Sequence, residues 1–161
     1  MSQSVPPPSS GNPFADGAYP QTPAPAAARD NVALGVAAAF ATALVSAGIY
    51  GGIIGATEYQ IGFAAVGVGY LIGLAAGKAG GGNPALPVVS AILSLGAVYL
   101  GQLLGLAIAV SDVLRLTVTE LFFENFPLLT TGWKEEAGPM SFLFLAIGAF
   151  AAFSAAKKSA A

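Results

Sequence analysis

Four long apolar stretches separated by short polar segments organise most of this chain. They cover residues 33–56, 61–77, 86–110 and 140–156, and none of them contains an Asp, Glu, Lys or Arg. An α-helix rises about 1.5 Å per residue, so stretches of this length cross a hydrocarbon core of about 30 Å. The pattern therefore predicts an all-α, polytopic membrane protein, with a bundle of four transmembrane helices formed by residues 32–158.

The connecting segments indicate which helices are neighbours. Only residues 57–60 separate the first two spans, so these spans are expected to form an antiparallel hairpin. Lys78 and a glycine-rich run ending in Asn83-Pro84 predict a flexible loop before the third span. The fourth span is short at 17 residues, so the ammonium groups of Lys157 and Lys158 are expected to reach the lipid headgroups.

The segment 112–133, between the third and fourth spans, fits two templates about equally. Residues 114–119 alternate as in a strand, but the segment also reads at a helical period. It combines scattered charges with the aromatic residues Phe122, Phe123, Phe126 and Trp133. Because this combination suits the headgroup zone, we favour a helix that continues the third span into the interface and ends before Pro127.

Residues 1–31 have a different composition. Seven of the eleven prolines lie there, among Ser, Gly, Ala and Gln residues. Proline has no backbone N–H, and the zone has too little apolar surface to offset the entropy of ordering the chain. We predict a disordered tail. Its length and proline content also argue against a cleaved signal peptide.

Basic residues predict the orientation in the membrane. With four spans, both termini and the middle loop share one side, which carries Arg29, Lys78, Lys157 and Lys158. The other side carries two basic residues, Arg115 and Lys134, among six acidic ones. Since basic segments are retained in the cytoplasm, we expect a multi-pass protein of the plasma membrane with both termini cytoplasmic.

Small residues recur every four positions on three spans. In lipid, apolar burial does not bring helices together, so close approach depends on small residues and on interhelical hydrogen bonds. We expect the helices to pack through Gly48, Gly52, Gly69, Gly73, Gly77, Gly101 and Gly105, with Gly51 and Gly55 on the row adjoining the first two. Packing within one chain is favoured, and a seam in a homo-oligomer or a larger membrane complex is the alternative.

Gln102 is the most polar side chain well inside a span. An amide at this depth is stabilised by a hydrogen bond to a neighbouring helix. We expect that contact to run through Ser46 or Tyr50, and we favour a structural role over contact with a substrate.

The composition excludes several kinds of chemistry. The chain is 55% hydrophobic and 9% charged, with a net charge of −2, and it has no Cys or His. Disulfides, thiolate nucleophiles, imidazole catalysis and the usual zinc sites are therefore excluded, and no basic field favours nucleic acid. The sequence contains no recognisable combination of a nucleophile, a general base and a group that orients the base. We expect no catalytic residue, cofactor or metal, and the lipid bilayer is the expected surrounding.

One stretch resembles a known sequence pattern. Residues 58–73, EYQIGFAAVGVGYLIG, resemble a motif of small uncharacterised bacterial membrane proteins with four spans, Y-E-I-G-Y-x-A-x-G-V-G-x-x-V-G. In those proteins a glycine-rich loop and a third span ending in L-L-G follow, as Leu103-Leu104-Gly105 does here. Residues 140–147 resemble their late segment, with Ser141 where an acid is frequent, and the proline-rich tail resembles those of high-GC Gram-positive bacteria. The resemblance implies fold and location, and no activity.

Function is therefore expected to lie in contacts rather than in catalysis. The leading hypothesis is a non-enzymatic scaffold, regulatory or accessory subunit. The alternative is a small transporter or channel component, for which a conduction path needs polar lining or a hydrophobic gate; the charge-free spans argue against this. An enzyme that acts on lipid comes third.

Overall fold

The computed structural model describes residues 30–160, and in that range every regular element is a helix. The helices are α1 (Val32–Thr57), α2 (Gly62–Gly80), α3 (Ala85–Leu114), α4 (Val118–Phe123), α5 (Phe126–Glu136) and α6 (Pro139–Ser159). Helices α1, α2, α3 and α6 are long and apolar enough to cross a membrane, so the predicted all-α, four-span fold is confirmed. Except for Asp30 and Asn31, the predicted disordered tail lies outside the described residues.

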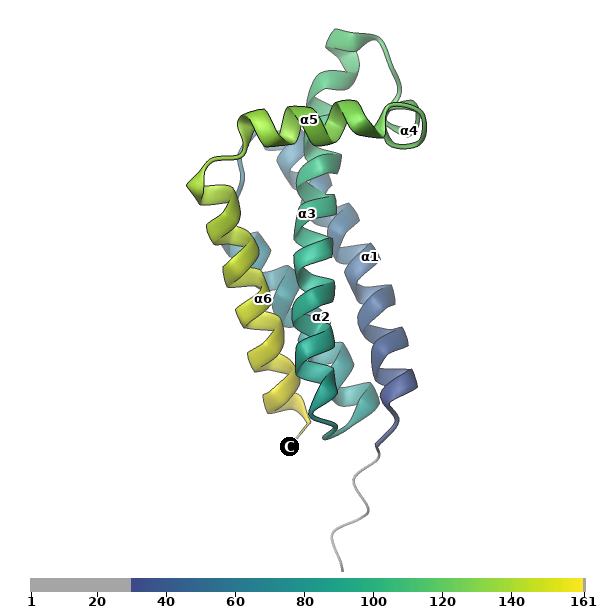
Figure 1. Ribbon diagram of the computed structural model, residues 1–161, viewed down its shortest axis with the longest axis vertical. Helices are drawn as coiled ribbons and strands as arrows, with labels where there is room; N and C mark the ends of the chain where they lie inside the picture. The colour runs from purple at the N-terminus through teal and green to yellow at the C-terminus, as the bar shows by residue number, and fades with distance from the viewer. Residues whose placement is uncertain (1–29, 161) are drawn as a thin grey trace, which may run out of the picture.

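The four long helices form an antiparallel bundle (Figure 1). Helix α1 packs against α2 and α3, α6 also packs against α2 and α3, and α2 meets α3 across the bundle. No contact joins α1 to α6 in the part of the chain that the structure describes. Helices α2 and α3 are therefore the central pair, with α1 and α6 on opposite sides.

The two described ends of the chain lie at the same end of the bundle, here called the terminal end (Figure 1). The Asn31 N–H donates to the Gly80 carbonyl at 3.0 Å, which joins the start of α1 to the end of α2. The Asn31 side chain also accepts from the Leu34 N–H and caps α1. Residue 31 is thus the helix cap rather than part of the tail.

Small residues make up much of the bundle core, beside large ones such as Ile72, while many other large apolar residues face outward. Ala39, Ala65 and Ala76 are completely buried, whereas Phe63 is 90% exposed and Phe150 is 74% exposed. Small residues at helix contacts and large apolar residues on the outer surface are expected when lipid surrounds the helices.

Helices α4 and α5 form a cap over the opposite end of the bundle, here called the cap end, and α5 lies across the bundle axis (Figure 1). The predicted continuous helix ending before Pro127 is wrong, because the chain turns twice in this segment. Arg115 adopts the left-handed conformation at φ 55° after the last residue of α3. A second turn follows α4, and Pro127 lies in the first turn of α5, where its missing N–H has no helical partner to lose.

The reason for these turns is apolar contact with α3. Leu121 and Leu129, from α4 and α5, are buried in one cluster with Leu103 and Ala107 of α3. A straight continuation of α3 would leave these leucines away from the bundle. The strand alternative for 114–119 is also absent from the described residues.

Candidate functional site

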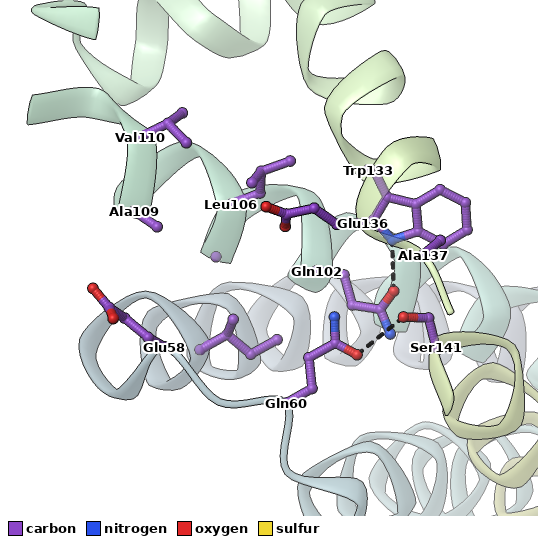
Figure 2. A pocket seen from close by; sticks show the side chains of 12 residues that line it. Glu58, Gln60, Gln102, Leu106, Ala109, Val110, Trp133, Glu136, Ala137 and Ser141 are labelled. Carbon is purple, nitrogen blue, oxygen red and sulfur yellow. Dashed lines mark hydrogen bonds between the residues drawn. The ribbon is translucent and has the colours of Figure 1, made fainter. Parts of the chain in front are cut away.

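Polar side chains from several segments meet beneath α5 in a cavity of about 260 Å³, here called the cap cleft. Its polar lining consists of Glu58, Gln60, Gln102, Trp133, Glu136 and Ser141 (Figure 2). These residues come from the α1–α2 turn, α3, α5 and the start of α6. The cleft is therefore built only when the cap is folded over the bundle.

Gln102 connects the bundle to the cap. Its side-chain oxygen accepts a hydrogen bond from the Trp133 indole N–H at 2.7 Å, and the residue is only 2% exposed. This hydrogen bond therefore runs to a residue of α5 and not to the predicted partner Ser46, while Tyr50, the other predicted partner, lies beside the same amide. Residues 46, 50 and 102 all lie on membrane-spanning helices, so their proximity could be expected from the sequence. The position of Trp133 depends instead on the turns that fold the cap back over the bundle.

Aromatic contacts hold the Trp133 ring in place. It meets Tyr99 of α3 edge to face at a centroid distance of 4.8 Å and Phe142 of α6 at 5.8 Å. Such edge-to-face pairs add to the stabilisation from burial alone. Trp133 therefore fixes the position of α5 relative to two of the spans.

An indole N–H only donates, so this bond fixes which end of the Gln102 amide is the oxygen. The Gln102 nitrogen, Nε2, is left buried with no hydrogen-bond partner among the described residues. The Tyr50 hydroxyl lies near this amide, but it forms no hydrogen bond of acceptable geometry. The hydroxyls of Ser90 and Ser94 on α3 are likewise buried without a partner in the described chain.

A second hydrogen bond closes the cleft on the side of α6. The Ser141 hydroxyl donates to the Gln60 side-chain oxygen at 3.2 Å (Figure 2). This bond ties the α1–α2 turn to the first turn of α6, although the two residues are 81 positions apart in the chain.

The charge in the cleft is negative. Of the described residues that line it, only Glu58 and Glu136 are charged, and both are exposed at its edge. Glu58 also ends α1 in a left-handed conformation at φ 58°. This conformation costs a residue with a Cβ about 1 kcal/mol or more relative to glycine, so the backbone is strained at this position.

The predicted packing glycines separate into two groups. A Cβ at Gly69 or Gly73 would collide with carbonyl oxygens of α6, and one at Gly77 would lie 2.6 Å from the Ala156 oxygen. A Cβ at Gly101 would lie 2.5 Å from the Tyr50 ring, and one at Gly105 would lie 2.6 Å from Cβ of Ile54. These five glycines lie at contacts between helices.

Gly48 and Gly52 do not pack against another helix of this chain, and the expectation for these two is wrong within one chain. No atom lies within 4 Å of the position that a Cβ would take at either residue. The adjoining row is used instead, where a Cβ at Gly51 or Gly55 would lie 2.6 Å from Leu104 or Ile108.

Two sets of contacts in the structure were not predicted from the sequence. Gly148, Ala152 and Ala156 form the surface of α6 that meets the α2 glycines, and their spacing of four was visible once alanine is counted with glycine. The grouping of Gln60, Trp133, Glu136 and Ser141 had no sequence signal, because it depends on how the cap folds. No protein family, curated protein or solved structure matches this chain.

Proposed function

We propose that this integral membrane protein is a non-enzymatic scaffold, regulatory or accessory subunit of the plasma membrane. It acts through protein–protein contacts made at its cap end. The observation that carries this proposal is the set of large apolar side chains exposed at the cap end.

The length of α3 supports this assignment. Its 30 residues span about 45 Å, which exceeds a hydrocarbon core of about 30 Å. Its end extends beyond the level of α5 (Figure 1). Residues near this end are therefore expected to lie in the headgroup zone or in water.

Large apolar side chains are nonetheless exposed at the cap end, on α3, α4 and α5. Val113 is 81% exposed, Phe123 is 84% exposed and Leu128 is 50% exposed. We call these three residues the cap surface. Exposed apolar side chains of this kind are typical of sites that contact other proteins or the membrane surface. We expect a partner protein to cover the cap surface.

Site-specific photo-crosslinking tests the proposal. A benzophenone amino acid replaces Phe123 in one variant and Phe150, which is exposed in the middle of α6, in a control. In native membranes we expect a discrete crosslinked protein product from position 123 and only lipid adducts from position 150. Lipid adducts alone at position 123, or the same product at both positions, would contradict the proposal.

A second candidate, a small transporter or channel component, is favoured by the buried polar atoms without partners. Ser90 and Gln102 are twelve positions apart on α3, or about 18 Å along the helix. Ser94 lies between them on the same helix, and Tyr50 is a buried residue of α1. Flux of a small polar solute through liposomes that contain the purified chain would favour this candidate. An impermeable liposome would exclude it.

A further inference from the structure

A cavity at the terminal end of the bundle combines an apolar wall with one charged side chain. Its volume is about 290 Å³, and it lies between the last turns of α6 and the α2–α3 loop with the start of α3 (Figure 1). We call it the terminal cleft; its lining includes Asn83, Pro84, Pro87, Phe153 and Lys157. Among the described lining residues only Lys157 is charged, so the cleft attracts an anion.

The Lys157 ammonium is accessible to a ligand. The side chain is exposed, and its Nζ lies 6.0 Å from the centroid of the Phe153 ring. Within residues 30–160 the ammonium therefore faces an aromatic ring rather than a carboxylate. An exposed contact of this kind stabilises a cation only modestly. A phosphate oxygen in the cleft would add a charge-assisted hydrogen bond, which is stronger.

The surrounding charges also favour an anion. Lys78 in the last turn of α2 and Lys158 beside Lys157 lie at the terminal end. Within the described residues, the one acidic side chain at this end is Asp30, which is exposed and outside the cleft lining. The Asn83 side-chain nitrogen donates to Asp30 at 3.4 Å. Since three lysines face one carboxylate, the field at the cleft is positive.

The start of α3 uses its own hydrogen-bond donors within the chain. The Asn83 side-chain oxygen accepts from the Ala85 N–H at 2.8 Å, and the Leu86 N–H donates to the Asn83 carbonyl at 3.1 Å. Pro87 has no backbone N–H. The donors that can bind an anion at a helix start are thus already engaged here, and recognition of the anion rests on Lys157.

An exposed apolar face of α6 leads from the cleft towards the middle of the membrane. Phe153 lies four positions before Lys157 and Phe150 lies seven positions before it, a spacing that places all three on one face of the helix. Phe150 is 74% exposed and Phe153 is 38% exposed. A ligand that joins an anionic group to long apolar chains would therefore meet the lysine and both rings at once.

We propose that the terminal cleft binds the headgroup phosphate of a phospholipid with a net negative charge. A phosphate oxygen accepts from the Lys157 ammonium, and an acyl chain lies along Phe153 and Phe150. Lys78 and Lys158 add to the positive field. Basic pockets between membrane helices are typical sites for anionic headgroups. This inference goes beyond the proposed scaffold function and does not depend on it.

Native mass spectrometry of the full chain in a non-ionic detergent tests the proposal. The chain is titrated with phosphatidylglycerol, whose phosphate is its only charge, and with phosphatidylcholine of the same acyl chains, in which a choline cation balances the phosphate. We expect phosphatidylglycerol to bind saturably and about fivefold more tightly or better. Glycerophosphoglycerol, the same headgroup without acyl chains, is expected not to compete at equal concentration, since it has no chain to place against the rings.

Two variants locate the site. Lys157→Gln is compared with Lys158→Gln, which removes the same charge from the neighbouring exposed residue, outside the described lining of the cleft. We expect Lys157→Gln to weaken phosphatidylglycerol binding about tenfold, as for the loss of a charge-assisted hydrogen bond. Lys158→Gln is expected to weaken it less than about threefold, because its charge acts only through a screened field. The proposal is overturned if Lys158→Gln weakens binding at least as much as Lys157→Gln, if the two lipids bind equally, or if glycerophosphoglycerol displaces the lipid.

Discussion

At the scale of single residues, the contact between α2 and α6 depends on positions that have no side chain. The backbone of α6 reaches Gly69 and Gly73 so closely that a Cβ at either would overlap a carbonyl oxygen. Backbone atoms cannot move aside as the end of a flexible side chain can. Each of these glycines is therefore needed for the two helices to approach.

Replacing one of them is expected to force the helices apart. For Gly73→Leu we predict a loss of about 3 kcal/mol in unfolding free energy, from overpacking against backbone. Thermal or denaturant unfolding in detergent measures the effect. Gly48→Leu is the matched control, because open space surrounds that position, and it is expected to leave monomer stability unchanged. Equal destabilisation by both would contradict the assignment. A change in oligomeric state with Gly48→Leu alone would identify a seam between copies on α1.

The bond between Trp133 and Gln102 gives a second prediction at this scale. Gln102→Leu, Trp133→Phe and the double variant form a cycle in which phenylalanine retains an aromatic ring toward Tyr99 and Phe142. We expect a coupling of about 1 kcal/mol between the two changes, a typical value for an interhelical hydrogen bond in a membrane protein. Additive effects on unfolding would show that the bond does not stabilise the cap.

The glycines also show the limit of sequence reasoning about single residues. On α2 a single row of glycines leaves one candidate face, and that face meets α6. On α1 two rows adjoin each other, Gly48 with Gly52 and Gly51 with Gly55, and the spacing fits both equally. Only the position of α3 decides that the second row is buried.

At the scale of elements, the cap is held by local signals at the start of each short helix. The Thr117 side chain accepts from the Glu120 N–H, and the Glu120 carboxylate accepts from the Thr117 N–H at 2.7 Å. This capping box satisfies two donors at the start of a six-residue helix. The hydrogen bond from the Thr117 backbone, with the Thr117 side chain second, holds the pKa of Glu120 below its ordinary value.

A pH dependence of α4 follows from this shift. Because the pKa of Glu120 is lower in the folded chain, the carboxylate stabilises α4 above its ordinary pKa of 4.5, and that contribution is lost as the pH falls through the lower folded value. The NMR shift of the Thr117 amide proton, followed against pH, is expected to titrate with a midpoint below 4.5. Glu120→Gln keeps an acceptor without the charge, so its Thr117 amide is expected not to titrate; a residual titration there would assign the effect to another group.

The cap also shows which element boundaries a sequence can supply. The Thr117-x-x-Glu120 spacing and Pro127 are recognised signals for helix starts, and with hindsight they mark α4 and α5. The turn at Arg115 has no such signal, because a non-glycine residue occupies the left-handed position. Burial of Leu121 and Leu129 against α3 offsets the strain there.

At the scale of the whole molecule, the bundle separates charge between its two ends. Lys78, Lys157 and Lys158 lie at the terminal end, while the cap end combines Arg115 and Lys134 with most of the acidic residues. This asymmetry is the basis for the predicted cytoplasmic location of both termini.

The orientation is testable by cysteine accessibility, since the natural chain has no cysteine. Glu124→Cys places a thiol at an exposed position of the cap, and Lys158→Cys places one at an exposed position of the terminal end. In intact cells, a membrane-impermeant maleimide is expected to label position 124 and to reach position 158 only after permeabilisation. The opposite pattern would reverse the orientation, and labelling at both positions would contradict the four-span topology.

The sequence by itself determined that four helices cross a bilayer, because uncharged stretches of sufficient length do so independently of what surrounds them. It also determined the small-residue face of α2 and the shared side of the two termini, since both follow from local spacing and an even number of spans. The tertiary structure decided which row of α1 glycines is buried, how the cap folds back, and that Gln60, Gln102, Trp133 and Ser141 meet in one cleft. These outcomes depend on contacts between residues far apart in the chain, and no local pattern of apolar and polar positions encodes such contacts.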